Sequence, residues 1–174
     1  MNIHQEILAK SEQNGHVCLY QHLKNVADNA RVMAKHLGFD EQIAVEGALL
    51  HDIGKVSPVF QQSLISPNKK KKPGAVFRHE IASLFFLSLV CQEHRDAVID
   101  MIVAHHKSMY RDVRNLGILD LDDASDCFEE HSKLFPEWSH IAIDILESLG
   151  LETHEVSLEE AKENYEYVID YCDG

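Results

Sequence analysis

An all-α domain is the fold class that the sequence predicts, and three observations lead to it. Apolar residues recur at helical spacings through most of the chain, no segment alternates like a half-buried strand, and no internal repeat is present. The chain has 174 residues, of which 45% are hydrophobic, and this is enough to bury one core. We therefore expect residues 1–174 to form a single domain.

The first two predicted helices cover residues 22–37 and 41–52. Gly38 ends the first helix and Gly54 closes the second, because glycine commonly follows the last helical turn. The apolar face of the first helix has residues spaced by three and four, namely Leu23, Val26, Ala30, Met33 and Leu37.

The remaining helices follow a short break. A third helix starts with Ser57 as N-cap and Pro58 in the first helical position. The segment SPNKKKKPG is predicted to be a loop, because prolines and glycine flank a run of like charges. Residues 107–120 are predicted to be irregular. Four more helices are expected at residues 79–91, 93–106, 138–149 and 158–172.

The composition bounds the cellular setting. No apolar run approaches the length of a membrane-spanning helix, and the N-terminus lacks a signal-peptide pattern, so we expect a soluble, cytoplasmic protein without a membrane partner. The four cysteines show no paired spacing, which argues against a disulfide framework or a thiolate zinc site. Twelve histidines are a high count and are the first indication of metal chemistry.

The negative charge is concentrated in the last third of the chain. Residues 121–174 hold 16 acidic and 2 basic residues, whereas residues 1–120 hold 13 acidic and 14 basic residues. This balance excludes a strongly basic reader of nucleic-acid sequence. It does not exclude a nuclease whose metal ions offset the phosphate charge.

Five histidines and one aspartate fall at predicted helix ends, where side chains from several helices can converge. They are His22, His51, Asp52, His79, His105 and His106. One histidine at a helix end is usually a surface residue or a partner of the helix dipole. The ordered set instead predicts a metal site, because imidazole and carboxylate groups bind transition-metal ions. The other seven histidines are predicted to be exposed: His4, His16, His36, His94, His131, His140 and His154.

The order H…HDxGK…H…HH resembles the HD superfamily of metal-dependent phosphohydrolases. Within it, the chain most resembles the HD nuclease domain of the CRISPR-associated helicase-nuclease of type I interference systems. The matching segments are YQHLKNVADNA, GALLHDIGKVSPVFQQSL, RHEIASLFFL and MIVAHHKS, which span residues 20–108. The resemblance implies an HD-domain helical bundle with the metal site at converging helix ends.

The resemblance also implies a two-metal centre with up to two divalent ions, such as Mn, Fe, Co, Ni or Mg. The first ion would be held by His22, His51 and Asp52. The second would be held by His79, His105 and His106, with Asp52 as the bridge. Lys55 would meet a phosphate oxygen, so Asp52 and Lys55 are the expected catalytic residues. Two neighbouring cations can activate a water and neutralise charge on the attacking and leaving oxygens.

The activity that this resemblance implies is the hydrolysis of single-stranded DNA, an endonuclease function in antiviral defence. A helicase domain or subunit and the CRISPR RNA-guided surveillance complex are the expected partners. Lys107 and Arg111 follow the histidine pair and could line an entry groove for the DNA backbone.

A late metal ligand is usual in this family, and here only Asp170 and Asp173 are candidates for it. We therefore expect the chain to be the N-terminal part of a longer protein in which a helicase follows.

Two other functions compete with the nuclease. The first is a phosphohydrolase that acts on nucleotides or cyclic dinucleotides, although the Gly-Tyr-Pro typical of the cyclic-dinucleotide branch is missing after His106. The second is a non-enzymatic module that has kept the fold, against which the intact ligand set weighs.

Overall fold

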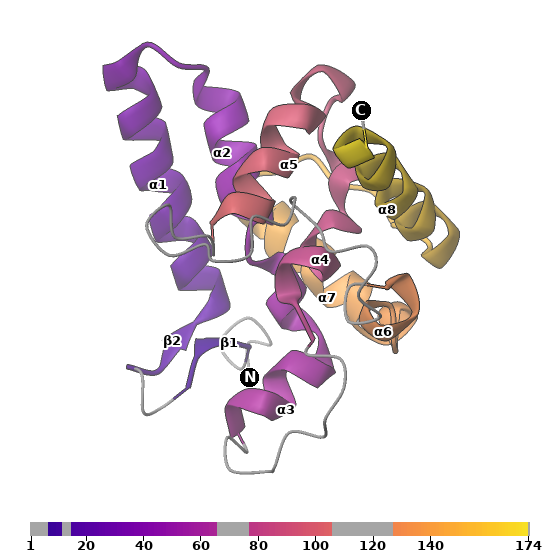
Figure 1. Cartoon of the computed structure of the whole chain (residues 1–174). Coiled ribbons are helices and arrows are strands. Elements are labelled where there is room, and N and C mark those ends of the chain that lie inside the picture. Colours follow the sequence, from indigo (N-terminus) through magenta and orange to yellow (C-terminus); the bar gives the residue numbers. More distant parts are fainter. Residues whose placement is uncertain (1–6, 12–14, 66–76, 106–126, 174) are drawn as a thin grey trace, which may run out of the picture.

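Helices that cross one another at the centre of the molecule build this fold (Figure 1). The computed structural model describes residues 7–11, 15–65, 77–105 and 127–173. The described helices are α1 (Leu19–Leu37), α2 (Glu41–Leu50), η3 (Ile53–Val56), α3 (Pro58–Ile65), α4 (His79–Leu84), η4 (Leu87–Leu89), η5 (Gln92–His94), α5 (Arg95–Ala104), α6 (Phe128–His131), α7 (Phe135–Ser148) and α8 (Leu158–Asp173). The predicted all-α class is confirmed.

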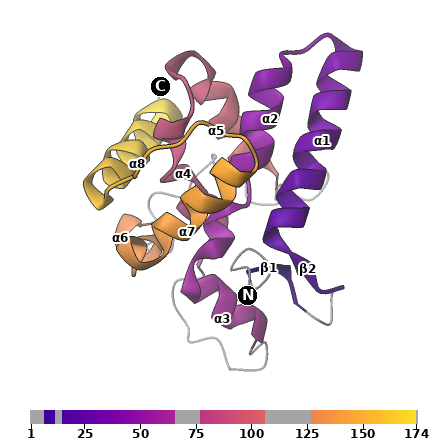
Figure 2. The ribbon, with the colours of Figure 1, turned by 180° about the vertical axis from the view of Figure 1, so that it is seen from behind.

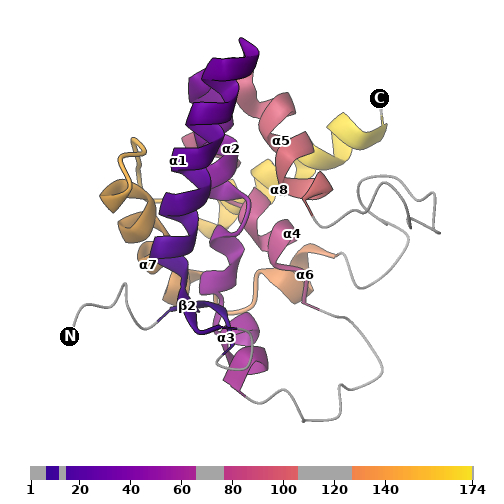
Figure 3. The same ribbon diagram turned by 90° about the vertical axis from the view of Figure 1, so that its left-hand side faces the viewer.

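A short antiparallel pair of strands, β1 (Leu8–Lys10) and β2 (Val17–Cys18), is an addition that the sequence did not predict. β2 leads directly into α1, as Figure 3 shows. The alternation over so few residues is too short to be recognised as a strand from the sequence.

The helix α1 ends where it was predicted to end. Gly38 adopts a left-handed conformation with φ of 74°, and its N–H donates to the carbonyl of Ala34. The predicted apolar face is wrong at its far end, because Met33 and Leu37 are 57% and 60% exposed. The buried stripe continues through Ala34 instead, which lies about 100° around the helix from Met33.

The second helix begins at a strong cap and stops earlier than expected. Asp40 Oδ1 accepts hydrogen bonds from the N–H groups of Gln42 and Ile43 at 2.7 and 3.0 Å. α2 then ends at Leu50 rather than at residue 52, and the chain continues through a turn into η3. The last two residues of the predicted helix, His51 and Asp52, thus lie in the turn between α2 and η3.

Gly54 is required for close packing rather than for ending a helix, which corrects the prediction. A Cβ atom at this position would lie 2.1 Å from the carbonyl oxygen of His79 and 2.7 Å from the nitrogen of Ser83. The Gly54 N–H also donates to Ser83 Oγ at 2.9 Å. The start of α4 can therefore lie directly against the end of the α2–η3 segment.

The predicted helix over residues 79–91 is broken after Leu84. In a continuing α-helix the carbonyl of Phe85 would accept from the N–H of Leu89. Here Asn164 Nδ2 donates to that carbonyl at 2.9 Å, and the Leu89 N–H donates to the carbonyl of Phe86 instead. Phe85 and Phe86, which follow the break, are both completely buried and both contact the ring of Phe135.

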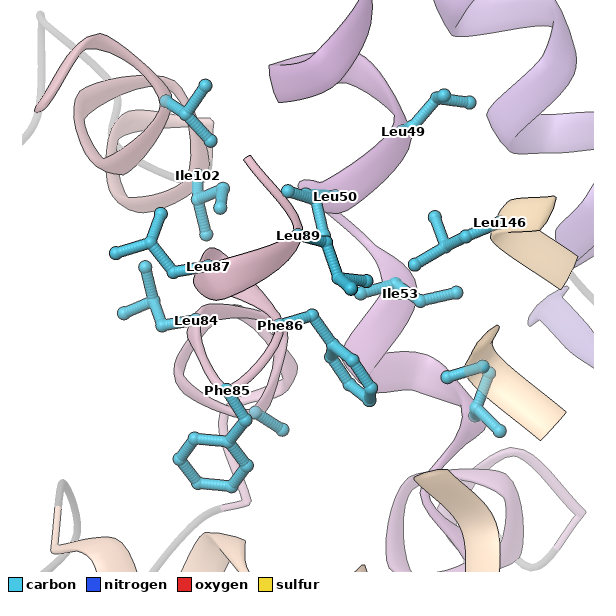
Figure 4. Close-up of a cluster of buried hydrophobic side chains, with 14 of the residues drawn as sticks. Leu49, Leu50, Ile53, Leu84, Phe85, Phe86, Leu87, Leu89, Ile102 and Leu146 are labelled. Atoms are coloured by element: carbon cyan, nitrogen blue, oxygen red, sulfur yellow. The ribbon is translucent and has the colours of Figure 1, made fainter. Parts of the chain in front are cut away.

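The hydrophobic core lies where α2, η3, α4 and η4 meet. In Figure 4 the side chains of Leu50, Ile53, Phe86 and Leu89 lie together, and all of them belong to the buried core. Seen from behind, α7 covers this region, and it packs against η3 (Figure 2). α7 and α8 confirm the predicted C-terminal helices, whereas α6 was not predicted.

α8 is tied to α5 by two phenol groups. The hydroxyl of Tyr167 donates to Asp96 at 2.9 Å, and the hydroxyl of Tyr171 donates to Asp100 at 3.2 Å. Within the described ranges, no helix combines the length and the apolar character needed to cross a bilayer.

We predict that Gly54→Ala lowers the free energy of unfolding by about 3 kcal/mol, because the new methyl group meets backbone atoms that cannot move aside. Denaturant unfolding followed by circular dichroism measures the change. Gly38→Ala is the matched control, because no atom lies within 4 Å of its Cβ position and only its positive φ adds a cost of about 1 kcal/mol. Equal costs for the two variants would contradict the close-packing role of Gly54.

Candidate metal centre

The candidate ligands lie at the ends of four helices, and these ends meet at one place. His22 lies in the first turn of α1, His51 and Asp52 follow the end of α2, His79 begins α4, and His105 follows α5. Asp52 is only 2% exposed and lies at the centre of this cluster. The predicted convergence of residues far apart in the sequence is present for all of these side chains.

One oxygen of Asp52 faces the residues from α1 and α2. Oδ2 lies 2.8 Å from His22 Nε2 and 3.2 Å from His51 Nε2. Lys55 Nζ lies 2.6 Å from the same oxygen. His22, His51 and Asp52 thus form a group whose ligand atoms all lie within 4.8 Å of one another.

The other oxygen of Asp52 faces the residues from α4 and α5. Oδ1 lies 2.9 Å from His79 Nε2 and 3.4 Å from His105 Nε2, and these three residues form a second group of the same size. The carboxylate therefore presents one oxygen to each group. The described members of the two sets that the resemblance implied thus lie at different oxygens of Asp52, whereas His106, the third histidine of the second set, lies outside the described residues.

The hydrogen bonds of two rings leave their other nitrogen available to an ion. His51 Nδ1 lies 2.7 Å from the carbonyl of Ala48, and His105 Nδ1 is hydrogen-bonded to the carbonyl of Ile102. A carbonyl can only accept, so Nδ1 carries the proton in both rings and Nε2 keeps its lone pair unless the ring takes a second proton. Such Nδ1–H contacts to carbonyls are the usual way in which proteins orient metal-binding histidines.

The cluster therefore fits a divalent cation by the chemistry of its donors. The Nε2 lone pairs of His51 and His105 face the oxygens of Asp52, so acceptor meets acceptor unless a cation or an added proton lies between them. Asp52 Oδ1 is also buried without a hydrogen-bond partner among the described residues, although His79 Nε2 is within hydrogen-bond distance. Imidazole nitrogen together with carboxylate oxygen suits Mn, Fe, Co, Ni or Zn.

The carboxyl group of Asp52 is ionised. Burial raises its pKa, but the four surrounding imidazoles at short range outweigh burial and hold the pKa well below the usual range of an aspartate. An ionised carboxylate can bind cations through both oxygens, so the bridging geometry does not require a prior loss of a proton.

The ammonium of Lys55 lies inside the cluster, where it is 8% exposed. The residue was expected to meet a substrate phosphate, which this structure does not test. Its ammonium pairs with Asp52 Oδ2, and it also lies 5.8 Å from the centroid of the Phe60 ring. A positive charge therefore stands at the oxygen that faces His22 and His51.

Several predicted residues are not part of the described geometry. His106, Lys107 and Arg111 lie outside the described residues, as does the lysine run at 69–72. Asp170 is exposed on α8 and belongs to neither ligand group. Nothing is described of the side chain of Asp173.

His131 is a residue that the sequence analysis placed wrongly. It was predicted to be exposed, yet it is completely buried. Its Nε2 accepts from the N–H of Arg78 at 3.0 Å, and its Nδ1 donates to the carbonyl of Cys127 at 2.9 Å. Arg78 directly precedes His79, so His131 fixes the chain at a candidate ligand. The polar neighbours of His131 in the sequence gave no signal of this long-range contact.

His94 also departs from its predicted exposure. Its ring lies 2.7 Å from the buried carboxylate of Glu46, and its side chain is 17% exposed. This contact holds η5 to α2, and neither His94 nor Glu46 is a candidate ligand.

The comparisons with known proteins agree with this geometry. The family model described as HD domain matches residues 19–130, a range that contains His22, Asp52 and His105. No curated protein and no solved structure matches the chain.

We predict that Asp52→Asn abolishes tight binding of divalent ions, because it removes the anionic charge that both ligand groups share. The loss of affinity should exceed the roughly 10–100-fold that removal of an outer hydrogen-bond partner costs. Titration calorimetry with Mn²⁺ measures it. Asp28→Asn is the control, since Asp28 is an exposed partner of Lys24. Undiminished binding by the Asp52 variant would contradict the bridging role.

We predict that His131→Asn lowers the free energy of unfolding by about 1 kcal/mol, because the shorter side chain leaves the partly buried N–H of Arg78 without its acceptor. The longer amide of His131→Gln can place an oxygen near the position of Nε2 and should retain most of the stability. Thermal unfolding and Mn²⁺ affinity should be measured together. If the Asn variant equals the unsubstituted chain in stability and in Mn²⁺ affinity, the contact does not position His79.

Proposed function

This chain belongs to the HD domain family of metal-dependent phosphohydrolases, and on that premise we propose that it is a nuclease that hydrolyses single-stranded DNA. The observation that supports the proposal best is the division of the Asp52 carboxylate between two ligand groups. Paired ions are characteristic of enzymes that hydrolyse phosphodiester bonds, where both the attacking and the leaving oxygen need charge stabilisation.

The residues of this chain have distinct parts in such a reaction. Divalent ions, when bound, would supply Lewis-acid charge and a nucleophilic water at neutral pH. Asp52 and the imidazoles would hold these ions, and the carbonyl contacts of His51 and His105 keep those two rings in place. Lys55 can exchange its contact with Asp52 for a phosphate oxygen, because an ammonium binds either anion as a point charge.

The choice of single-stranded DNA rests on sequence features. The tract HDIGKVSPVFQ resembles the nuclease domain of the type I helicase-nuclease more than the other branches of the family. The charge balance of the sequence excludes a strongly basic reader of base edges, so contacts are expected with the backbone rather than with a sequence. Lys107, Arg111 and Lys55 are the basic residues that we assign to these backbone contacts.

The proposed partners follow from the proposed substrate. Duplex DNA must be separated before a single-strand nuclease can act, so we assign a helicase domain or subunit as the partner. An RNA-guided CRISPR surveillance complex would deliver the target in antiviral defence.

We predict cleavage of a single-stranded oligonucleotide without sequence preference in the presence of Mn, Co, Ni, Fe or Mg, and little cleavage of an intact duplex of the same sequence. Gel analysis of end-labelled strands measures both. Asp52→Asn should be inactive, which excludes a contaminating nuclease. Turnover of mononucleotides or cyclic dinucleotides without DNA cleavage would replace this proposal by a small-molecule phosphohydrolase.

A further inference from the structure

The helix α3 lies beside the metal centre but outside the hydrophobic core. None of its residues is buried, and Val59 and Ile65 are 37% and 75% exposed. α3 extends to the lower edge of the molecule in Figure 1, and it packs mainly against η3 and β1.

Phe60 is the aromatic residue of this helix, and its contacts are unusual. Within the described ranges it is not among the side chains that pack against the hydrophobic core. Its ring contacts the His79 ring edge-on, with 5.0 Å between centroids, and lies 5.8 Å from Lys55 Nζ. Phe60 thus adjoins a candidate metal ligand and a candidate phosphate contact while remaining partly exposed.

The position of Phe60 is fixed by its neighbours. Gln61 Nε2 donates to the carbonyl of Lys55 at 2.7 Å and to the carbonyl of Leu8 at 2.9 Å. Gln61 Oε1 accepts from the N–H of Leu8 at 3.0 Å. Because one amide joins α3, β1 and the backbone of Lys55, the helix that carries Phe60 is held in place beside the centre.

A flat apolar ring beside a phosphate-binding centre suits a nucleobase. In a nucleotide only the sugar separates the base from its phosphate, so a phosphate bound by Lys55 brings a base close to α3. Stacking on an aromatic ring tolerates every base, since every base has a π-face. Bases within a duplex are already stacked on their neighbours and are not available to such a ring.

We propose that Phe60 is the residue on which a nucleobase adjacent to the scissile phosphate stacks. The assignment rests on the proposed function only in requiring a substrate that carries a base. The base belongs either to a DNA strand or to a free nucleotide, and both sources share this chemistry. Stacking at Phe60 makes the centre prefer unpaired strands without reading their sequence.

The test compares Phe60→Leu with Phe60→Tyr on two strands. The first is a single-stranded oligonucleotide, and the second carries a tract of abasic sugar phosphates within the same sequence. Leucine keeps an apolar side chain but loses the π-face, so cleavage between ordinary nucleotides should fall about 10-fold, whereas cleavage within the abasic tract should not change. Tyrosine should retain the unsubstituted rate on both strands. Ile65→Ala, on the same helix but 75% exposed, is the matched control and should have no effect.

Binding without turnover gives a second readout. A strand that carries 2-aminopurine loses fluorescence when its base stacks, and titration in Ca²⁺ should show quenching that is lost in Phe60→Leu and kept in Phe60→Tyr. Mn²⁺ affinity of each variant is measured in parallel, because Phe60 also touches His79. If Phe60→Leu loses Mn²⁺ binding, or if its cleavage of both strands is slowed equally, Phe60 has a structural role and the proposal is overturned.

The two proposals fail in different ways. If the unsubstituted chain turns over nucleotides but not DNA, the nuclease is wrong, and the same variants are then compared on a nucleotide and on ribose 5-phosphate. A selective loss on the nucleotide would support stacking of a free nucleotide base. If Phe60→Leu slows the reaction equally on the two compounds, or if its quenching is unchanged, the role of Phe60 is overturned.

Discussion

The buried carboxylate of Asp52 is the group on which the arrangement of the surrounding helices depends. An ionised aspartate that is 2% exposed carries a large desolvation cost, which only charged or polar partners at short range can offset. Those partners come from α1, α2, η3, α4 and α5, so these elements must end or begin at one point. Gly54 allows this convergence, because the start of α4 can pack directly against a residue that has no side chain.

Much of the candidate site could be predicted because its signals are local. His51, Asp52 and Lys55 lie within one short tract, and the helix ends that carry His22, His79 and His105 are marked by periodicity and by breaks in it. The order of the motif H…HDxGK…H…HH indicates, in addition, which of these helix ends meet. The outer contacts could not be predicted, since the bond between His131 and Arg78 joins residues 53 positions apart.

The errors in the fold have the same cause. The apolar run LFFLSLV contains too few polar residues for its periodicity to show where the helix stops. The break after Leu84 depends on Asn164, which reaches the carbonyl of Phe85 from the C-terminal helix. Likewise, Met33 and Leu37 have helical spacing, but only the position of α2 decides which side of α1 is covered.

The composition of the two ligand groups has an electrostatic consequence. Within the described residues, Asp52 is the one anionic member of both groups, and the other members are neutral imidazoles when they bind metal. Two divalent ions held in this way would keep most of their positive charge, and the ammonium of Lys55 adds to it. An anionic phosphate compound that enters the centre would therefore act as the missing counter-ion. A strongly acidic protein can in this way attract an anion at one point while repelling it from the segment in which its acidic residues are concentrated.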